Sequence, residues 1–471
     1  MLKQCAALLI SLALSACISL DPSYKRPTAP VPATWPSGPA YAPAQPGDVT
    51  AADIPWREFV KDEKLRKVVE QALANSRNLR KAVANIQAAR AQYHSQRASL
   101  FPHIDASASK SRSRSLNPYA GIGQSAFTME NDSAELGVSS FEIDLFGKQH
   151  SLSRAAFESY LSTAEAARAT RISLIAETIS SYLTIAADKT SLDIAKRTLE
   201  SARHSMEVTR SRLDAGVASL VDVKQAETVY QQARYDSANL TATIAEDLDA
   251  LTLLVGSQVE DSLLPDELPA GGAWLAEVPA GISSEVLLKR PDVLEAEHTL
   301  KSANADIGAA RAAFFPSVTL TANGGRASSS LSTLFKGPTV WSVAPNIDLP
   351  IFKGGANVAN LTYSKAQRDA YVAAYELAVQ TAFKEVADAL AVRGTIQEQL
   401  DAQAALVNAA SESYRLADAR YSKGADTFLN ALDSQRTLYS AQKTLVATRL
   451  TALENIVTLY RVLGGGLAER S

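Results

Sequence analysis

The sequence predicts a mainly helical chain with a small β part, built as two copies of one repeat of helix, β-hairpin, long helix and helix. Long stretches have 3.6-residue periodicity, the period changes to two at matching places in both halves, and short motifs recur. The 471 residues include only 22 Gly and 19 Pro, with 46% hydrophobic and 21% charged residues. This composition is typical of a folded chain and excludes an all-β protein.

Residues 1–16 have the pattern of an export signal. Lys3 supplies the positive charge, residues 6–14 are apolar, and small residues precede Cys17. The apolar stretch is too short for a membrane-spanning helix. We therefore expect a cleaved signal peptide over residues 1–16.

A proline-rich strap is expected over residues 17–55. Nine of the nineteen prolines lie between residues 21 and 55, which excludes a helix and favours an extended chain. At about 3.1 Å per residue such a strap could reach on the order of 100 Å. The sequence therefore allows Cys17 to lie far from the start of the folded region.

Two segments of the chain repeat each other, residues 56–256 and residues 291–464. Arg97-Ala-Ser-Leu-Phe-Pro-His-Ile corresponds to Arg311-Ala-Ala-Phe-Phe-Pro-Ser-Val, and both repeats end on Val-Gly or Leu-Gly. Residues 257–290 connect the repeats, and residues 465–471 form a tail. The same order of elements with small insertions indicates a duplication.

In each repeat a first helix, over 77–99 or 291–313, ends at Phe-Pro because proline cannot continue it. Two-residue alternation then predicts a hairpin. The expected strands cover about 102–115, 132–146, 316–329 and 339–352. In the second of these the alternation slips at Ser139-Ser140, which predicts a β-bulge.

A very long helix without proline follows each hairpin, about 148–213 and about 356–421. Apolar residues spaced 3 and 4 apart predict coiled-coil seams. The seams are Ile172, Ile175, Ile179, Leu183 and Ala186, then Val372, Tyr375, Val379, Phe383 and Val386. Tight turns near 214–219 and 422–427 should lead into return helices. From their lengths, we expect each first helix and return helix to stack end to end beside the long helix.

Four strands are too few to close a barrel, and an isolated sheet with one apolar face would leave its edges open. Strands of this length suit a tilted transmembrane strand, so several chains could close a membrane barrel together. A small soluble sheet packed on helices is the alternative, favoured by the modest apolarity of Ala106, Ala108 and Ala322. Alternation alone leaves both open.

Several classes of function are disfavoured. The net charge of −3 and the lack of a basic run argue against a nucleic-acid partner. Both cysteines lie at the N-terminus, and the five histidines lack metal-ligand spacing, so no metal site is expected. The sequence Ser107-Ala-Ser-Lys110 lacks the companion motifs of a Ser/Lys enzyme, and Gly121-Ile-Gly123 lacks the rest of a dinucleotide motif. We expect neither catalytic residues nor a cofactor.

Leu14-Ser15-Ala16-Cys17 resembles the bacterial lipobox. Together with Tyr24-Lys-Arg-Pro27 in the strap, Lys289-Arg-Pro-Asp-Val293 opening the second repeat, the paired Phe-Pro helix ends and the Leu-Gly-Gly-Gly terminus, the chain resembles the outer membrane factors. These are the TolC-like, NodT-type efflux lipoproteins. The resemblance implies lipidation at Cys17. Ile18, in place of Asp, then fits sorting to the cell outer membrane.

The resemblance also implies a homotrimer, with twelve strands in a transmembrane β-barrel and a periplasmic α-barrel closed at its far tip. Residues 56–75, 257–290 and 464–471 would form a belt. The implied function is the exit duct of a tripartite efflux system, passively conducting small molecules such as drugs from a periplasmic adaptor and inner-membrane pump. The alternatives are a lipid-anchored periplasmic coiled-coil scaffold or adaptor, and a type I protein secretion duct.

By the same resemblance, the turns at the hairpin tips would contact the adaptor. These turns are Gly216, Val217, Ala218 and Ser219, and Gly424, Ala425, Asp426 and Thr427. Leu429 and Asp433, four apart on one helical face, match the family's constriction residues, and Tyr421 matches a residue that holds the tip closed. Asn430 replaces a second acidic residue of some relatives, so the number of acidic rings stays open. The alternative is that Leu429 packs in a seam and Asp433 is a solvated carboxylate.

Overall fold

The structure is a computed structural model that describes residues 19–41, 51–116, 126–269, 271, 273–279 and 283–466. The chain divides into two units. Unit 1 comprises Met1–Thr28, Asn85–Ala164 and Glu295–Tyr375, and unit 2 comprises Ala29–Ala84, Glu165–Leu294 and Glu376–Ser471. Four helices, α4 (Arg77–Ala98), α5 (Lys148–Asp214), α7 (Pro291–Ala312) and α8 (Ala356–Ser422), have residues in both units.

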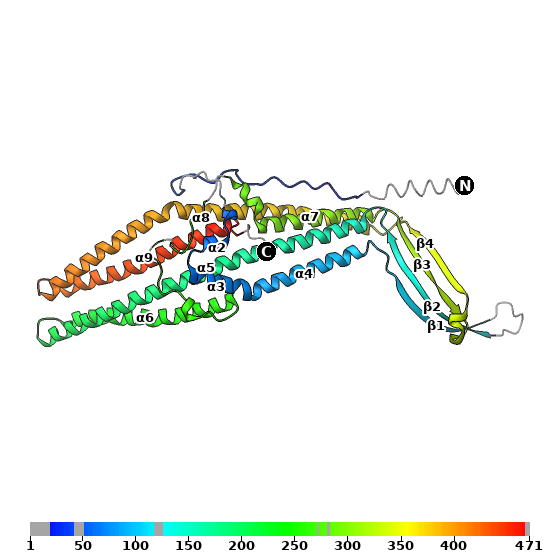
Figure 1. Cartoon of the computed structure of the whole chain (residues 1–471). Helices are drawn as coiled ribbons and strands as arrows, with labels where there is room; N and C mark the ends of the chain where they lie inside the picture. Colours follow the sequence, from blue (N-terminus) through cyan, green and yellow to red (C-terminus); the bar gives the residue numbers. More distant parts are fainter. Residues whose placement is uncertain are drawn as a thin grey trace. The chain divides into compact units, whose positions relative to one another are not determined.

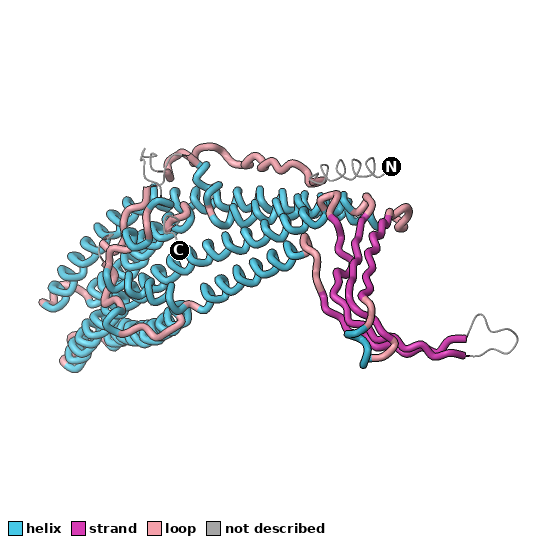
Figure 2. Tube along the Cα trace, turned by 45° about the vertical axis from the view of Figure 1, so that its right-hand side comes forward, coloured by secondary structure: helices cyan, strands magenta, loops and turns pink. Residues whose placement is uncertain are grey.

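Unit 1 contains one four-stranded antiparallel sheet in the order β1-β2-β3-β4 (Figures 1 and 2). The strands are β1 (Asp105–Leu116), β2 (Ala126–Ile143), β3 (Ser317–Ser328) and β4 (Thr339–Asp348). β2 begins six residues before the expected position 132, because it pairs with β1 as far as Leu116. β4 ends at Asp348 rather than at 352, just before Pro350, which has no N–H for a ladder.

The bulge expected at Ser139-Ser140 is confirmed. The register between β2 and β3 shifts between Val138 and Phe141, and Ser140 has a φ of 51°. The Ser140 N–H donates to Thr321 Oγ1 at 3.2 Å, which satisfies a group that the ladder omits. Because of the bulge, Val138 and Phe141 lie on the same face of the sheet.

Unit 2 holds two helical hairpins, α5 with α6 (Leu220–Val255) and α8 with α9 (Phe428–Val462) (Figure 1). The seam predicted on α5 is confirmed, since Ile179, Leu183 and Ala186 are fully buried and Ile172 and Ile175 nearly so. On α8, Tyr375 of unit 1 and Val379 and Val386 of unit 2 are also fully buried. Apolar spacing read from the sequence therefore located these seams correctly.

The helix ends in unit 2 agree with the end-to-end stacking predicted for the shorter helices. Gly256, just after α6, lies so close to the junction between α3 (Glu63–Asn75) and α4 that an added Cβ would be 2.5 Å from Asn75 O and 3.3 Å from Ser76 Cα. Its φ of 80° is also one that glycine adopts without strain. In the second repeat, the Arg290 guanidinium, directly before α7 (Pro291–Ala312), donates to Val462 O at the end of α9 at 2.8 Å.

Arg290 is the centre of a buried ionic network. Its guanidinium contacts Asp292 at 2.6 Å and Glu385 on α8 at 2.7 Å, and its side chain is only 8% exposed. The segment between the repeats is thereby fixed to α8 and to the end of α9. This buried guanidinium therefore links three parts of the chain that are distant in sequence, namely the segment before α7, α8 and the end of α9.

The strap is docked from its first described residues rather than free. In unit 1, Asp21 accepts hydrogen bonds from Ser151 at 2.5 Å and Arg154 at 2.6 Å, and Arg26 pairs with Glu297 at 2.7 Å. In unit 2, Trp35 packs on Phe383 with ring centroids 5.4 Å apart. Side-chain contacts therefore hold residues 19–36 against the folded part of the chain.

The described helices include none that is both long enough and apolar enough to cross a membrane.

Candidate functional site

The two hairpin tips of unit 2 have the same turn. Gly216 and Gly424 both have a φ of 73°, and the next residue in each case donates its N–H to a carbonyl five residues earlier, at 2.9 Å. This is the Schellman ending of a helix, which favours glycine because of its left-handed backbone. The duplicated motif therefore places two equivalent tips at the ends of α5 and α8.

The residues after each turn start the return helix in different ways. Ser219 caps α6 by accepting from the Asp222 N–H, and Asp222 accepts from the Ser219 N–H. In the second tip, Asp426 accepts from the Thr427 N–H and from Asn430, and pairs with Arg420. These bonds lower the pKa of Asp426, the Thr427 N–H most. Asn430, found where a second acidic residue was considered, thus supports the tip turn.

Tyr421 is buried where the two hairpins meet. Its hydroxyl lies 3.2 Å from Thr209 Oγ1 on α5, and the Arg212 guanidinium stands over its ring at 4.4 Å. Arg212 also donates to Ser422 O at 3.1 Å. Sequence reasoning singled out Tyr421 but missed Thr209 and Arg212, because nothing local marks a partner on another helix.

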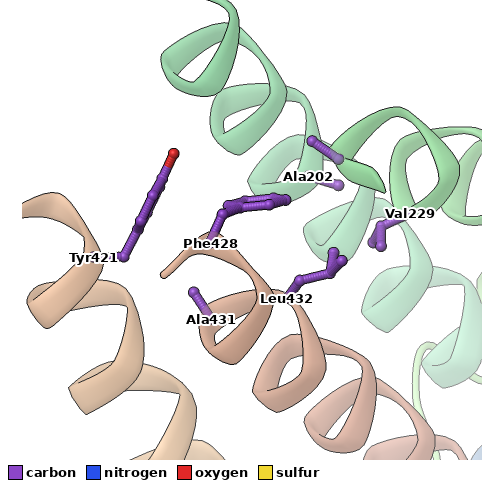
Figure 3. Close-up of a cluster of buried hydrophobic side chains, with 7 residues drawn as sticks. Ala202, Val229, Tyr421, Phe428, Ala431 and Leu432 are labelled. Carbon is purple, nitrogen blue, oxygen red and sulfur yellow. The ribbon is translucent and has the colours of Figure 1, made fainter. Parts of the chain in front are cut away.

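A small apolar cluster lies beside Tyr421 (Figure 3). Phe428 points from α9 toward Ala202 on α5, and Leu432 lies near Val229 on α6. Phe428 and Leu432 are 5% and 1% exposed. These residues, and not Leu429, make the contact between the hairpins within one chain.

Leu429 and Asp433 both lie on the exposed side of α9. Leu429 is 54% exposed, and Asp433 is exposed as well. Within a single chain Leu429 does not occupy the seam that was considered as an alternative. Both side chains are free to face a second copy of the chain or an open space.

A polar cluster further from the tip also joins the hairpins, and sequence reasoning missed it. Asp236 on α6 accepts from Tyr439 on α9 at 2.6 Å and from Gln232 at 2.9 Å, and Lys443 lies at 3.3 Å. Burial acts to raise the pKa of Asp236, but these donors and the ammonium together hold it below the usual value. The carboxylate therefore stays charged and holds α6 against α9.

The sheet in unit 1 has a continuous apolar area on one face, made of four cross-strand rows. Its cross-strand rows are Ile143, Val318 and Ile347; Phe141, Leu320 and Pro345; Val138, Ala322 and Val343; and Leu136, Gly324 and Trp341. Trp341 and Ile347 are 77% and 70% exposed. An apolar face this exposed on a single chain needs an apolar environment or a covering partner.

The opposite face of the sheet is polar, and its two edges are open. On this face Asn323 donates to Glu135, and Ser109 and Ser133 are hydrogen-bonded at 2.8 Å. Among the described strands, β1 and β4 each pair on one side only. A sheet with an apolar area on one face, a polar opposite face and two open edges has the features expected of a segment of a larger membrane-spanning barrel. The fold thus defines a channel-forming membrane protein.

The comparisons with known proteins agree. The model of the outer membrane efflux protein family matches residues 68–257 and 282–465, one match for each repeat. The chain is 47% identical over 469 residues to two Pseudomonas putida proteins, the toluene efflux pump outer membrane protein TtgC and the antibiotic efflux pump outer membrane protein ArpC. Each alignment covers 98% of this chain and 96% of the relative. The crystal structure of the open state of the Neisseria gonorrhoeae MtrE outer membrane channel superposes with a TM-score of 0.84 and 36% identity, covering 95% of this chain and 98% of that one.

The chain belongs to the outer membrane efflux protein family. It is an outer membrane exit duct of an efflux system, and the resemblance inferred from its motifs is confirmed. The predicted fold class, mainly helical with a small duplicated β part, is confirmed as well.

The lipidation residue predicted from the sequence, Cys17, lies outside the described residues. In the part of the chain that the structure describes, no three His, Cys, Asp or Glu side chains gather as metal ligands would.

Proposed function

We propose that three copies of this chain form one continuous duct, with twelve strands crossing the outer membrane and the helices enclosing a periplasmic channel. The observation that carries the proposal is the open sheet, which has an apolar face and an unpaired edge on both β1 and β4. Edge strands exposed in this way favour pairing with another chain, and closure removes every edge. Three four-stranded sheets give an even number of strands.

The cargo proposed for the duct is a range of small, largely apolar molecules. The relatives' names specify antibiotics and toluene. A duct of this kind needs no catalytic residue, since the energy would come from an inner-membrane pump that hands cargo over through a periplasmic adaptor. This function is transport and not enzymatic catalysis.

The two tips are the proposed contact with the adaptor. Val217 is 74% exposed and Leu220 and Val221 are 60% and 63% exposed, so the first tip presents apolar side chains to solvent. Apolar exposed residues beside polar turns suit a partner with helical hairpins of its own. In the second tip, Asp426 is bonded to Arg420.

The proposed gate consists of Leu429, Asp433 and Tyr421. Three-fold symmetry would bring three copies of exposed Leu429 and Asp433 together, while Tyr421 holds α8 to α5 within each chain. A ring of leucines would form an apolar constriction and a ring of aspartates would attract cations.

Cys17 is the proposed lipid anchor. Cys17→Ser should block acylation and leave uncleaved or mislocalised precursor, measured by mass spectrometry and by membrane fractionation. Normal acylation of this variant would refute the anchor.

The duct itself is tested separately. Membranes extracted with carbonate should retain the protein, and the purified protein should run as a heat-modifiable trimer with the mass of three chains in detergent. A protein released by carbonate as a monomer would instead be a peripheral scaffold, and the proposal would be wrong.

A further inference from the structure

Within unit 1, a groove of about 580 Å³ lies between α5, α7 and α8. α7 contributes mainly small residues, among them Ser302, Ala309 and Ala310. α8 contributes larger polar ones, Tyr363, Gln367 and Tyr371. A volume in this range holds a drug-sized molecule.

The groove and the strap occupy opposite faces of α7. Strap residues contact Glu297, Asn304, Gly308 and Arg311, which lie within about 60° of one another on the helix. The groove residues Ser302, Asp306, Ala309 and Ala313 lie on the other side, roughly 180° away. α7 therefore separates the strap from the groove.

This arrangement indicates which side of the duct wall the groove faces. Asp21 is held at 2.5 Å by Ser151, and only four peptide units separate it from Cys17, a reach of about 14 Å. An acylated Cys17 must enter the lipid outside the duct, so the face of α7 under the strap points outward. The groove then faces the channel interior. This step rests on the proposed lipid anchor and duct.

The chemistry of the groove favours a positively charged ligand. No described residue forms an ion pair or hydrogen bond with the Asp306 carboxylate. Lys148, the lysine in the lining, is engaged by Glu142 at 3.1 Å. Asp306 is exposed in the single chain, but the nearby helices, and then the Asp21 carboxylate, raise its pKa, as expected for a carboxyl group without a cation beside it.

Two aromatic rings complete the site. Tyr363 is 65% exposed and lines the groove together with Tyr371. Tyrosine faces bind organic cations and stack on flat aromatic rings, each by about 0.5–2 kcal/mol. A carboxylate without a partner and two accessible phenol rings are complementary to one ligand class.

We propose that this groove is a binding site for aromatic organic cations on the inner wall of the duct, where cargo of that class pauses during passage. The site lies in unit 1 and is separate from the tip residues of unit 2.

Ethidium is a suitable probe, titrated by fluorescence anisotropy against the purified full-length protein in detergent. Asp306→Asn should weaken ethidium binding by about tenfold, and Tyr371→Leu by roughly threefold or more. The matched control is Asp369→Asn, which removes an exposed carboxylate from the opposite face of α8 and should bind ethidium as wild type does. Fluorescein, an anionic aromatic dye, should not bind. Absence of ethidium binding to wild type, or equal binding to wild type and Asp306→Asn, would overturn the proposal.

Planar bilayers test the direction of the groove. Ethidium should reduce the current through wild type and leave Asp306→Asn unaffected at the same concentration. Binding that depends on Asp306 without a reduction of current would refute the inner-wall placement. The dye titration does not involve Cys17, so failure of the lipid anchor and failure of this site give different results.

Discussion

The hydroxyl of Tyr421 on α8 lies 3.2 Å from Thr209 Oγ1 on α5, and both residues are buried. Thr209 already donates its hydrogen to Ser205 O at 2.8 Å, so the Tyr421 hydroxyl is the donor of this bond. The bond links the two hairpins close to their tips. Removing the Tyr421 hydroxyl breaks this one bond and leaves no buried hydrogen-bond donor without an acceptor.

Tyr421→Phe should therefore loosen the tip without unfolding the chain. The loss is one hydrogen bond, about 1 kcal/mol per chain, while the ring keeps its contact with Phe428. We expect higher single-channel conductance in planar bilayers and little change in Tm. Tyr235→Phe, at a tyrosine that is 65% exposed, is the control. Equal conductance of Tyr421→Phe and wild type would exclude this bond as part of the gate.

Leu429→Ala and Asp433→Ala should affect different properties of the channel. Shortening Leu429 widens an apolar constriction, so conductance should rise. Removing the Asp433 carboxylate should reduce cation preference, measured as a reversal potential in a salt gradient. Lys196→Ala, at an exposed residue on α5, is the control for surface charge. If both gate variants behaved as wild type while Lys196→Ala changed the conductance, the constriction would lie elsewhere.

Gly308→Ala should release the strap. A Cβ at this position would lie 1.8 Å from Asp21 Oδ1 and 2.7 Å from Ser151 Oγ, although alanine itself favours a helix. We expect faster trypsin cleavage at Lys25 in the folded protein. Gly271→Ala is the control, since a Cβ there meets no atom within 4 Å.

A variant that carries both Gly308→Ala and Asp21→Ala tests whether Gly308→Ala acts through the clash of its Cβ with Asp21. Adding Asp21→Ala to Gly308→Ala should give no faster cleavage than Asp21→Ala alone, because the same contact is already lost. Additive effects would show that Gly308 acts on something other than the strap.

The Asp188 and Asp247 pair should make stability depend on pH. Burial first, and then the neighbouring Asp247 carboxyl, raise the pKa of Asp188 to about 6, and Asp247 Oδ2 is buried. Between about pH 4 and pH 6 the folded state thus binds more protons than the unfolded state, so stability falls as the pH rises through this window. Tm should be higher at pH 5 than at pH 7.5.

Asp247→Asn should reduce that difference in Tm, because an amide can hydrogen-bond to an ionised Asp188. Asp249→Asn, at an exposed position on the same helix, should keep the wild-type pH dependence. An unchanged difference in Asp247→Asn would rule out the pair as its source.

Arg290→Ala should strongly destabilise unit 2. It leaves the partly buried Glu385 carboxylate and Val462 O without their donor, at a cost of about 3–5 kcal/mol. Thermal unfolding followed by circular dichroism measures the loss. Arg197→Ala breaks an exposed pair with Asp193 and should cost at most about 1 kcal/mol. A similar small cost for both variants would contradict the structural role of Arg290.

The sequence by itself determined the elements and their order. Proline after Phe101 and Phe315 ends two helices, Gly216 and Gly424 mark the tips, and the slip at Ser139-Ser140 marks the bulge. Each of these is a property of neighbouring residues, encoded in backbone preference or in a two- or 3.6-residue period. The class of protein followed from the same local motifs taken together.

Only the tertiary structure decided which side chains meet. Thr209 and Tyr421 are 212 residues apart, Asp236 and Tyr439 are 203 apart, and Ser151 is 130 residues from Asp21. The periodicity of the sequence does not predict such pairs. They depend on how each helix is rotated about its axis and on the close approach that Gly308 allows. The groove beside Asp306 likewise exists only where α5, α7 and α8 pack together, so composition could reveal neither its volume nor its unpaired carboxylate.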